Sequence, residues 1–169
     1  QRNTVANMTS NPISIWTLSQ NNTVLQNTVS FTYNNGNAAI RINNASNNNV
    51  TSNVVYNVTG GLGIETYSNG NRLENNSVEN LTGGRGISIG SQSENNTAYL
   101  NNVSWSYGLQ GIEVVNASYN NVSYNRVTNT TSTGIQAITL STYNTIQDNF
   151  VTGQSGGETS AFYIFNSSF

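Results

Sequence analysis

Few side chains in this sequence could carry out acid–base chemistry. Its 169 residues hold seven carboxylates, six of them glutamates and one, Asp148, an aspartate, and there is no histidine or cysteine. Disulfides, thiolate or imidazole metal sites and a nucleophile activated by histidine are therefore excluded. The chemistry left open is that of paired carboxylates, and no cofactor is expected.

Charge and hydropathy exclude further partners. Charged residues make up 7% of the chain, its net charge is −2 and all five cations are arginines, so no basic field exists to attract nucleic acid or an anionic membrane. No apolar run approaches the roughly 18 residues of a membrane span. The chain opens on Gln1 without a basic and then apolar leader, so we expect a secreted chain in its mature form.

Any site must be positioned by a repeat that runs through the sequence. The pattern Asn-x-apolar-x-x-Asn-x-apolar occurs six times, in copies displaced by 26, 23, 25, 24 and 24 residues. Composition alone favours a disordered asparagine-rich segment, but disorder gives no reason for apolar residues to stay in phase. The repeated asparagines are Asn22, Asn48, Asn71, Asn96, Asn120 and Asn144 at the first position and Asn27, Asn53, Asn76, Asn101, Asn125 and Asn149 at the second, with Asn3 in a half copy before them.

Each copy is followed by a polar or glycine-rich turn and a short alternating strand. Every period therefore offers three extended pieces joined by three bends, without helical periodicity. The alternating strands begin at Ile13, Ile40, Ile64, Ile87, Ile112 and Ile135, and the last four of these follow directly on Gly63, Gly86, Gly111 and Gly134.

One architecture satisfies this pattern. The sequence predicts an all-β fold, a parallel β-helix of about seven coils, with three short strands and about 24 residues per coil, in a single domain over residues 1–169. Asparagines tolerate the left-handed backbone of tight bends, and their amides can bond to the asparagine one coil away, so they are expected to form ladders. The residue two positions after each ladder asparagine then points inward, into a core narrow enough for a chain that is only 35% apolar.

In these repeats the sequence resembles the right-handed parallel β-helices of the pectate-lyase-like superfold. It is similar in particular to the Asn-x-Ile/Val-x-x-Asn repeats of periplasmic copper-insertion proteins and of archaeal surface proteins. The resemblance covers nearly the whole chain and implies the right-handed fold. It does not fix a function, because this superfold includes lyases, hydrolases, adhesins and scaffolds.

Enzymes of the superfold, as the resemblance implies, act on polysaccharides through clustered carboxylates. In the repeat frame Glu65 and Glu113 share an outward column on either side of Ser88, about 9.6 Å apart, which is near the separation used by an inverting glycosidase. However, Arg41 is the neighbour of Glu65 in that column, and we interpret the two as an exposed ion pair. The sequence therefore predicts that the chain is not an enzyme.

Two other motifs invite a functional interpretation. The segments TGGLG (59–63) and TGGRG (82–86) look like phosphate-binding loops, but no helix follows them, so they are predicted to be turns. Exposed aromatics could stack on sugar rings, although covering a solenoid bend is the favoured role for them. These aromatics are Tyr119 and Tyr143, which share a column, and Trp105 and Tyr107.

Asparagines outside the ladders match the acceptor pattern for N-linked glycans more often than composition predicts. This excess indicates an extracellular, glycosylated surface in which sugars replace the missing surface charge. The thirteen candidate sites are Asn7, Asn21, Asn44, Asn49, Asn57, Asn75, Asn80, Asn95, Asn102, Asn116, Asn121, Asn129 and Asn166.

The two ends of the sequence suggest self-assembly. No cap is visible at either end, and joining the end to the start continues the repeat in phase, which predicts a head-to-tail filament, sheath or surface layer at the cell surface. The alternatives are a carbohydrate-binding or adhesin module, or a non-catalytic piece of a longer β-helix protein. In the filament the junction would contain Gln1, Arg2, Val5, Asp148 and Phe169, with Arg2 of the next copy over Asp148.

Overall fold

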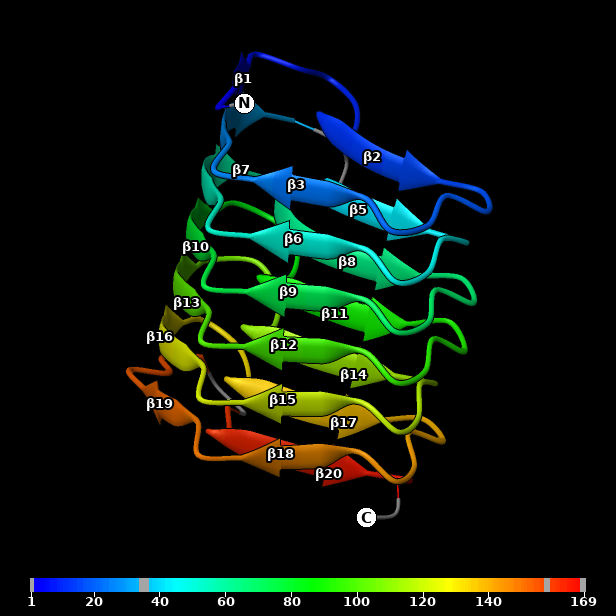
Figure 1. The fold of residues 1–169 in the computed structure, drawn as a ribbon. Coiled ribbons are helices and arrows are strands. Elements are labelled where there is room, and N and C mark those ends of the chain that lie inside the picture. Colours follow the sequence, from blue (N-terminus) through cyan, green and yellow to red (C-terminus); the bar gives the residue numbers. More distant parts are fainter. Residues whose placement is uncertain (1, 34–36, 157–158, 168–169) are drawn as a thin grey trace.

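The computed structural model describes residues 2–33, 37–156 and 159–167, and within these ranges every regular element is a β-strand. The strands wind as a right-handed parallel β-helix in which each coil stacks on the one before (Figure 1). The predicted fold class is confirmed, with a period of about 24 residues, as from Val103 to Val127. None of the described residues belongs to a helix that is long and apolar enough to cross a membrane.

Among the described residues the strands form three parallel sheets. Sheet 1 contains β1 (Thr4–Ala6), β4 (Thr28–Thr32), β7 (Val54–Val58), β10 (Ser77–Leu81), β13 (Asn102–Ser106), β16 (Arg126–Thr130) and β19 (Phe150–Thr152). Sheet 2 contains β2 (Ile13–Trp16), β5 (Ala38–Asn43), β8 (Gly60–Glu65), β11 (Ile87–Gly90), β14 (Ile112–Val115), β17 (Ile135–Ile138) and β20 (Phe162–Phe165). Sheet 3 contains β3 (Thr23–Leu25), β6 (Asn49–Thr51), β9 (Arg72–Glu74), β12 (Thr97–Tyr99), β15 (Asn121–Ser123) and β18 (Thr145–Gln147).

Inward residues stack in columns that form the core. β-Branched side chains suit these short strands, because they pack well on a pleated surface. The columns end in partly buried residues at both ends of the helix, among them Val5 and Val151. Fully buried members include Val29, Val55, Val78, Val103 and Val127 in sheet 1, Ile42, Ile64, Ile89 and Val114 in sheet 2, and Val50, Leu73, Ala98 and Val122 in sheet 3.

The register of sheet 2 differs from the prediction at one strand. Ile87 pairs with Leu62, and Ile89 pairs with Ile64, so the predicted alignment of Ile64 with Ile87 is wrong by two residues. The glycine that precedes the aligned position is accordingly Gly61 instead of Gly63, and its position faces the carbonyl oxygen of Gly86. The cause is a shorter connection after β7, because TGGLG lies almost entirely in strand β8, whereas TGGRG remains a turn.

The asparagines of the repeat form two continuous ladders along the helix. In the first ladder the side-chain amide of each asparagine donates to Oδ1 of the next at 3.0–3.2 Å. In the second, from Asn3 to Asn149, the same bonds measure 2.9–3.0 Å. The backbone N–H of each asparagine donates to the same oxygen, as that of Asn53 does to Asn76 at 2.9 Å.

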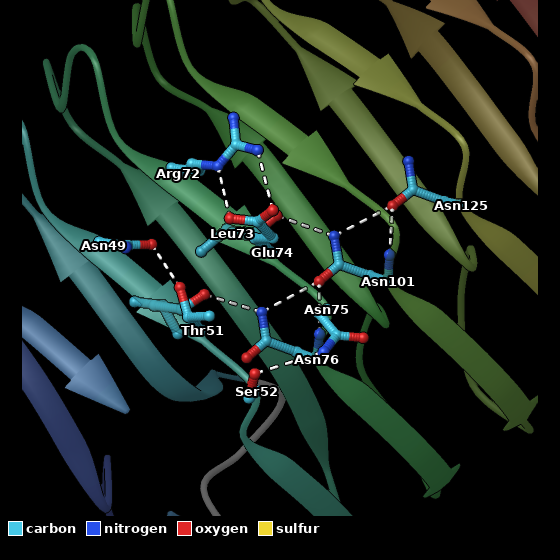
Figure 2. A network of polar contacts seen from close by, with 11 residues as sticks. Asn49, Thr51, Ser52, Arg72, Leu73, Glu74, Asn75, Asn76, Asn101 and Asn125 are labelled. Atoms are coloured by element: carbon cyan, nitrogen blue, oxygen red, sulfur yellow. Dashed lines mark hydrogen bonds and ion pairs between the residues drawn. The ribbon is translucent and has the colours of Figure 1, made fainter. Parts of the chain in front are cut away.

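Asn76 shows why this position favours asparagine (Figure 2). Its Oδ1 accepts two hydrogen bonds from Asn53, and its Nδ2 donates to Oδ1 of Asn101 at 3.0 Å and to the carbonyl oxygen of Val50 at 2.9 Å. The amide thus uses both donors and both acceptor positions while only 1% of the residue is exposed. No other side chain of this length offers two donors and two acceptors, since aspartate lacks the donors.

The left-handed bends lie one residue earlier than expected. The ladder asparagines themselves do not have positive φ; from Asn22 onward the residue directly before each one does, and it is asparagine in only some coils. Tyr119, for example, has φ of 58° ahead of Asn120, and Asp148 has φ of 53° ahead of Asn149. The ladder is therefore selected by hydrogen bonding, and the backbone strain falls on its neighbour.

Candidate functional site

A polar cleft of ≈ 260 Å³ lies on the outer face of sheet 2. Two of its lining residues, Gly60 and Gly90, are glycines, which leave the floor without a side chain at these positions. The cleft crosses four neighbouring strands, from β5 to β14. Its polar lining consists of Asn37, Glu65, Arg85, Ser88, Ser91 and Glu113.

Glu113 is the most deeply placed charge in this cleft. It points outward from β14, yet only 2% of the residue is exposed. Arg85, from the turn before β11, forms an ion pair with one carboxylate oxygen, and Gln136 Nε2 donates to the other at 2.6 Å. A buried carboxylate is tolerated only with such partners, so these contacts fix its position.

Glu65 occupies the other side of the cleft. Arg41 Nη2 lies 2.6 Å from Glu65 Oε2, and the two side chains are 18% and 24% exposed, so the predicted ion pair is present but half-buried. The guanidinium also lies 5.1 Å from the ring centre of Trp16. The pair is diagonal, because the register places Glu65 opposite Asn43 and Arg41 opposite Gly63.

The register also corrects the predicted column of carboxylates. Ser88 pairs with Glu113 on one side and with Gly63 on the other, so Glu65 lies two residues beyond the column in which it was expected. The cleft nevertheless brings Glu65 and Glu113 together as lining residues. Each of them is held by its own arginine, which leaves neither carboxylate without a cation.

A second polar depression of ≈ 470 Å³ adjoins the first on the same face. Gln136 connects the two, since it lines the second depression and donates to Glu113 in the first. Gln110 lines it as well, and its buried Oε1 has no hydrogen-bond partner among the described residues. We call the two depressions together the polar groove; the second is lined by Gln110, Ser132, Thr133, Gln136, Thr159, Ser160 and Tyr163.

Backbone pairing explains why the polar groove follows the helix axis. The carbonyl groups of Arg85, Gln110, Thr133 and Ser160 accept the backbone N–H groups of stacked glycines at 2.9–3.1 Å, so these four residues form one column. Ser88, Glu113 and Gln136 form the neighbouring column. From β5 to β20 the groove spans five steps of about 4.8 Å, or about 24 Å. The repeat does not predict the groove, because it specifies ladder asparagines and apolar strand residues and leaves the residue types in the loops unspecified.

The exposed aromatics lie at bends outside the polar groove. Tyr119 and Tyr143 stack on each other with ring centres 5.0 Å apart and planes 13° apart, and each occupies a position of positive φ. The ring centres of Trp105, a positive-φ residue near the end of β13, and Tyr107, just after that strand, lie 6.3 Å apart. Because the two tyrosines each cover one ring face of the other, this geometry favours the bend-covering role over sugar stacking.

Most of the thirteen candidate glycosylation sites lie at positions of positive φ. None of these asparagines is buried, and ten have positive φ between 48° and 57°. Asparagine is favoured at such positions for conformational reasons, and Ser or Thr two residues later falls where a β-branched or small polar residue suits the strand. The excess of acceptor patterns therefore has a backbone explanation that does not need a glycan. The ten are Asn7, Asn21, Asn44, Asn57, Asn75, Asn80, Asn95, Asn116, Asn129 and Asn166, and the remaining three, Asn49, Asn102 and Asn121, begin strands.

The expected junction residues fall at opposite ends of shared columns. Arg2 Nε donates to Gln26 Oε1 at 3.1 Å in the first coil, and Asp148 accepts a hydrogen bond from Tyr124 in the last, which raises the pKa of the tyrosine. Val5 and Val151 likewise end the sheet 1 column. Gln1 and Phe169 lie outside the described residues.

These features define a parallel β-helix protein with a polar groove on one outer sheet. The chain belongs to the NosD family, whose model, described as periplasmic copper-binding protein, matches residues 1–155. Among solved structures it is similar to the periplasmic alginate epimerase AlgG, with a TM-score of 0.71 and 15% identity over 95% of this chain and 43% of that one. A mutant of the same epimerase matches with a TM-score of 0.57 and 14% identity over 87% and 44% of the two chains.

At these identities the likeness to the epimerase shows the fold alone. This chain spans less than half the length of the solved structures it matches. A search of curated proteins found no significant match.

Copper, which the family description mentions, does not fit the residues of this chain. Copper sites are built from imidazole, thiolate or thioether ligands, and the sequence has no histidine, no cysteine and one methionine. Nor do the described residues gather three or more carboxylates at one point. No step of the chemistry below involves a metal.

Proposed function

We propose that the chain is a non-catalytic carbohydrate-binding β-helix module. The observation that carries the proposal is Glu113, an outward-facing carboxylate that is 2% exposed and fixed by Arg85 and Gln136 at the floor of the polar groove. Outward residues of a β-helix ordinarily meet water, so a buried carboxylate that is paired with an arginine and accepts from a glutamine there indicates a surface shaped for a ligand. Arg85 Nε and Glu113 Oε2 are in ionic contact without hydrogen-bond geometry. A long polar groove along the axis suits a linear glycan.

The pairing of the carboxylates supports binding over catalysis. A general acid or base must exchange a proton with the substrate, whereas Glu65 and Glu113 are each engaged by a guanidinium. We therefore propose that these groups orient sugar hydroxyls and take no part in bond cleavage. Cleavage of any polysaccharide that disappears in Glu65→Gln or Glu113→Gln would contradict this.

A glycan array with a blocked groove tests the proposal. Ser88 points outward between the two carboxylates, so Ser88→Trp is expected to fill the cleft without touching the core and to weaken glycan binding at least about tenfold. The matched control is Thr97→Trp, an outward position on β12 of sheet 3 and outside the groove, which should bind as the parent does. If the parent binds no glycan, the proposal fails; if Ser88→Trp binds as well as the parent, the groove is not the site.

We also propose that the chain works outside the cytoplasm. The family description and the solved epimerase structures both name periplasmic proteins. A location at the cell surface is the finer form of this proposal. Fractionation of the native cells, with the chain detected by antibody, distinguishes surface, periplasmic and cytoplasmic pools.

A structural subunit that stacks head to tail is a second candidate. Its support is a depression of ≈ 350 Å³ in the first coil, lined by Val5, Ile13 and Val24, which another coil of the same pattern would cover. That coil could belong to a further stretch of the same polypeptide or to another copy. Electron microscopy of the purified chain tests the second case, which predicts filaments with an axial repeat of about 34 Å for seven coils.

A coat of N-linked glycans is a separate proposal, supported by the exposure of the acceptor asparagines. Six of the thirteen are exposed and the other seven are half-buried; the exposed ones include Asn21, Asn75 and Asn95. The intact mass of the chain purified from its native cells, before and after enzymatic release of N-glycans, measures the occupancy. An unchanged mass would contradict the glycan coat, and the preference for asparagine at positive φ would then be the remaining explanation for the excess of acceptor patterns.

A further inference from the structure

The charges in the polar groove point to the class of glycan that it takes. We infer that the groove binds an uncharged oligosaccharide and discriminates against polyuronates, an inference that rests on the proposed carbohydrate-binding function. The solved epimerase of similar fold is named for alginate, which is a polyuronate. The ligand class inferred for this chain therefore differs from the one in that name.

Recognition of a uronate carboxylate needs a cation that is available to it. Arginine and lysine provide such contacts, with arginine preferred for paired hydrogen bonds. The chain has no lysine. Arg85 lines the groove and is engaged by Glu113, and Arg41, which lies beside the groove, is engaged by the lining residue Glu65. To bind either guanidinium, a uronate would have to compete with the glutamate that already holds it, which is Glu65 or Glu113.

The other arginines lie away from the groove. Arg72 is paired with Glu74 on β9 of sheet 3, at 2.7 Å. Arg126 begins β16 of sheet 1 and lies over the ring of Phe150, with 4.7 Å between the guanidinium carbon and the ring centre. Arg2 donates to Gln26 in the first coil. With a net charge of −2, the chain also has no long-range field that would attract a polyanion.

The remaining groups in the groove suit hydroxyls. Gln110 lines the groove, and its buried Oε1 has no hydrogen-bond partner among the described residues, so a turn of this side chain toward the groove would present an acceptor to a sugar hydroxyl. Ser88, Ser91 and Thr133 add hydroxyls that both donate and accept. A uronate carboxylate only accepts, so it cannot satisfy Gln110 Oε1.

The experiment compares uncharged and acidic oligosaccharides by calorimetry on the parent chain and two variants. The probes are hexasaccharides of glucose and mannose units against hexamers of mannuronate and galacturonate. Glu65→Gln removes a carboxylate from the groove lining and releases Arg41, which that carboxylate holds. Glu74→Gln is the matched control, because it removes the partner of Arg72 on sheet 3, outside the groove.

The parent is expected to bind at least one uncharged hexamer more than about tenfold tighter than either uronate, with little dependence on salt concentration. Glu65→Gln is expected to gain at least about tenfold in affinity for a uronate hexamer, while Glu74→Gln gains nothing. A parent that prefers a uronate overturns the inference and leaves carbohydrate binding standing. Equal uronate affinity in Glu65→Gln and the parent also overturns it, and binding of neither class removes both the inference and the proposed function.

Discussion

Arg85 and Glu113 belong to successive coils, and their ion pair ties the turn before β11 to the centre of β14. The guanidinium side chain is 40% exposed and the carboxylate side chain 2%, so the arginine meets the solvent while the glutamate lies beneath it. The pair thus serves the fold as well as the groove, and its two roles can be separated by substitution.

Removing the cation alone should destabilise the chain. Arg85→Met leaves the Glu113 carboxylate buried with only Gln136 as a partner, at an expected cost of about 2–3 kcal/mol in the free energy of unfolding. The double variant Arg85→Met/Glu113→Gln should recover most of that loss. Urea denaturation of all four members of the cycle measures the coupling, and strictly additive effects would show that the two side chains do not interact.

The ladders should be most sensitive in their middle. Asn76→Ala removes four hydrogen bonds, so Val50 O and the Asn53 N–H lose this partner and Asn101 Oδ1 keeps only the backbone N–H of residue 76, for an expected loss of about 3–5 kcal/mol. Asn149→Ala is the matched comparison, because that half-buried residue closes the ladder and its loss should cost clearly less. Thermal or urea unfolding gives both values, and equal losses would argue against a cooperative ladder.

The stacked glycines should not accept a side chain. A Cβ on Gly86 would lie 2.3 Å from Val103 Cγ1 and 2.4 Å from the carbonyl oxygen of Gly111, so Gly86→Ala should prevent close stacking and destabilise the chain by about 3 kcal/mol or more. Gly83→Ala in the same turn meets only Thr59 Cγ2 at 3.1 Å and should be tolerated. Comparison of the two melting temperatures is the test, and a stable Gly86→Ala chain would contradict the stacking.

A carboxylate on sheet 3 should contribute to acid stability. The hydrogen bonds from Arg72 lower the pKa of Glu74, so the folded state favours its ionised form. This contribution is present above the pKa of the unfolded chain, about 4.3, and is lost as the pH falls through the lower folded value. Glu74→Gln should therefore reduce the stability difference between pH 7 and pH 3, as followed by circular dichroism; an unchanged difference would count against the ion pair.

If copies of the chain stack head to tail, a charge swap should reveal it. Arg2 and Asp148 end the same column of bend residues, so Asp148→Arg should weaken assembly and Arg2→Asp in addition should restore it. Sedimentation velocity over a range of concentrations measures the effect. A double variant that assembles no better than Asp148→Arg would remove this contact from the proposal.

The fold followed from the sequence because a period of about 24 residues keeps both asparagines and their apolar neighbours in fixed columns. The register of β8 did not follow from the sequence, for a reason that applies to any β-strand. Inward and outward residues alternate with a period of two, so a shift of two residues leaves Ile64 facing inward and changes only its partner. Glycines compound the ambiguity, since Gly61 and Gly63 fit a strand or a turn and have no side chain to mark the face.

The groove could be predicted only in part. Glu65 and Glu113 were singled out for their spacing, and the structure does place both in one cleft. Arg85 and Gln110 were missed because they lie in turns, where the repeat imposes no residue type. A polar residue directly before three of the stacked glycines, in Arg85-Gly86, Gln110-Gly111 and Thr133-Gly134, is the signal that could have found them.

The asparagine-to-asparagine hydrogen bonds all run in one sense, because each amide directs one side-chain N–H toward the asparagine of the later coil and its Oδ1 toward that of the earlier one, as from Asn76 to Asn101. The second N–H of Asn76 donates to the carbonyl oxygen of Val50 in the earlier coil. The small dipoles of the asparagine-to-asparagine bonds consequently add along the axis, in the way that peptide dipoles add in an α-helix, and the rod acquires an electrical polarity that its sheets alone would not give it. Any further turn that extends the rod, whatever polypeptide supplies it, must arrive with its amides oriented in that same sense.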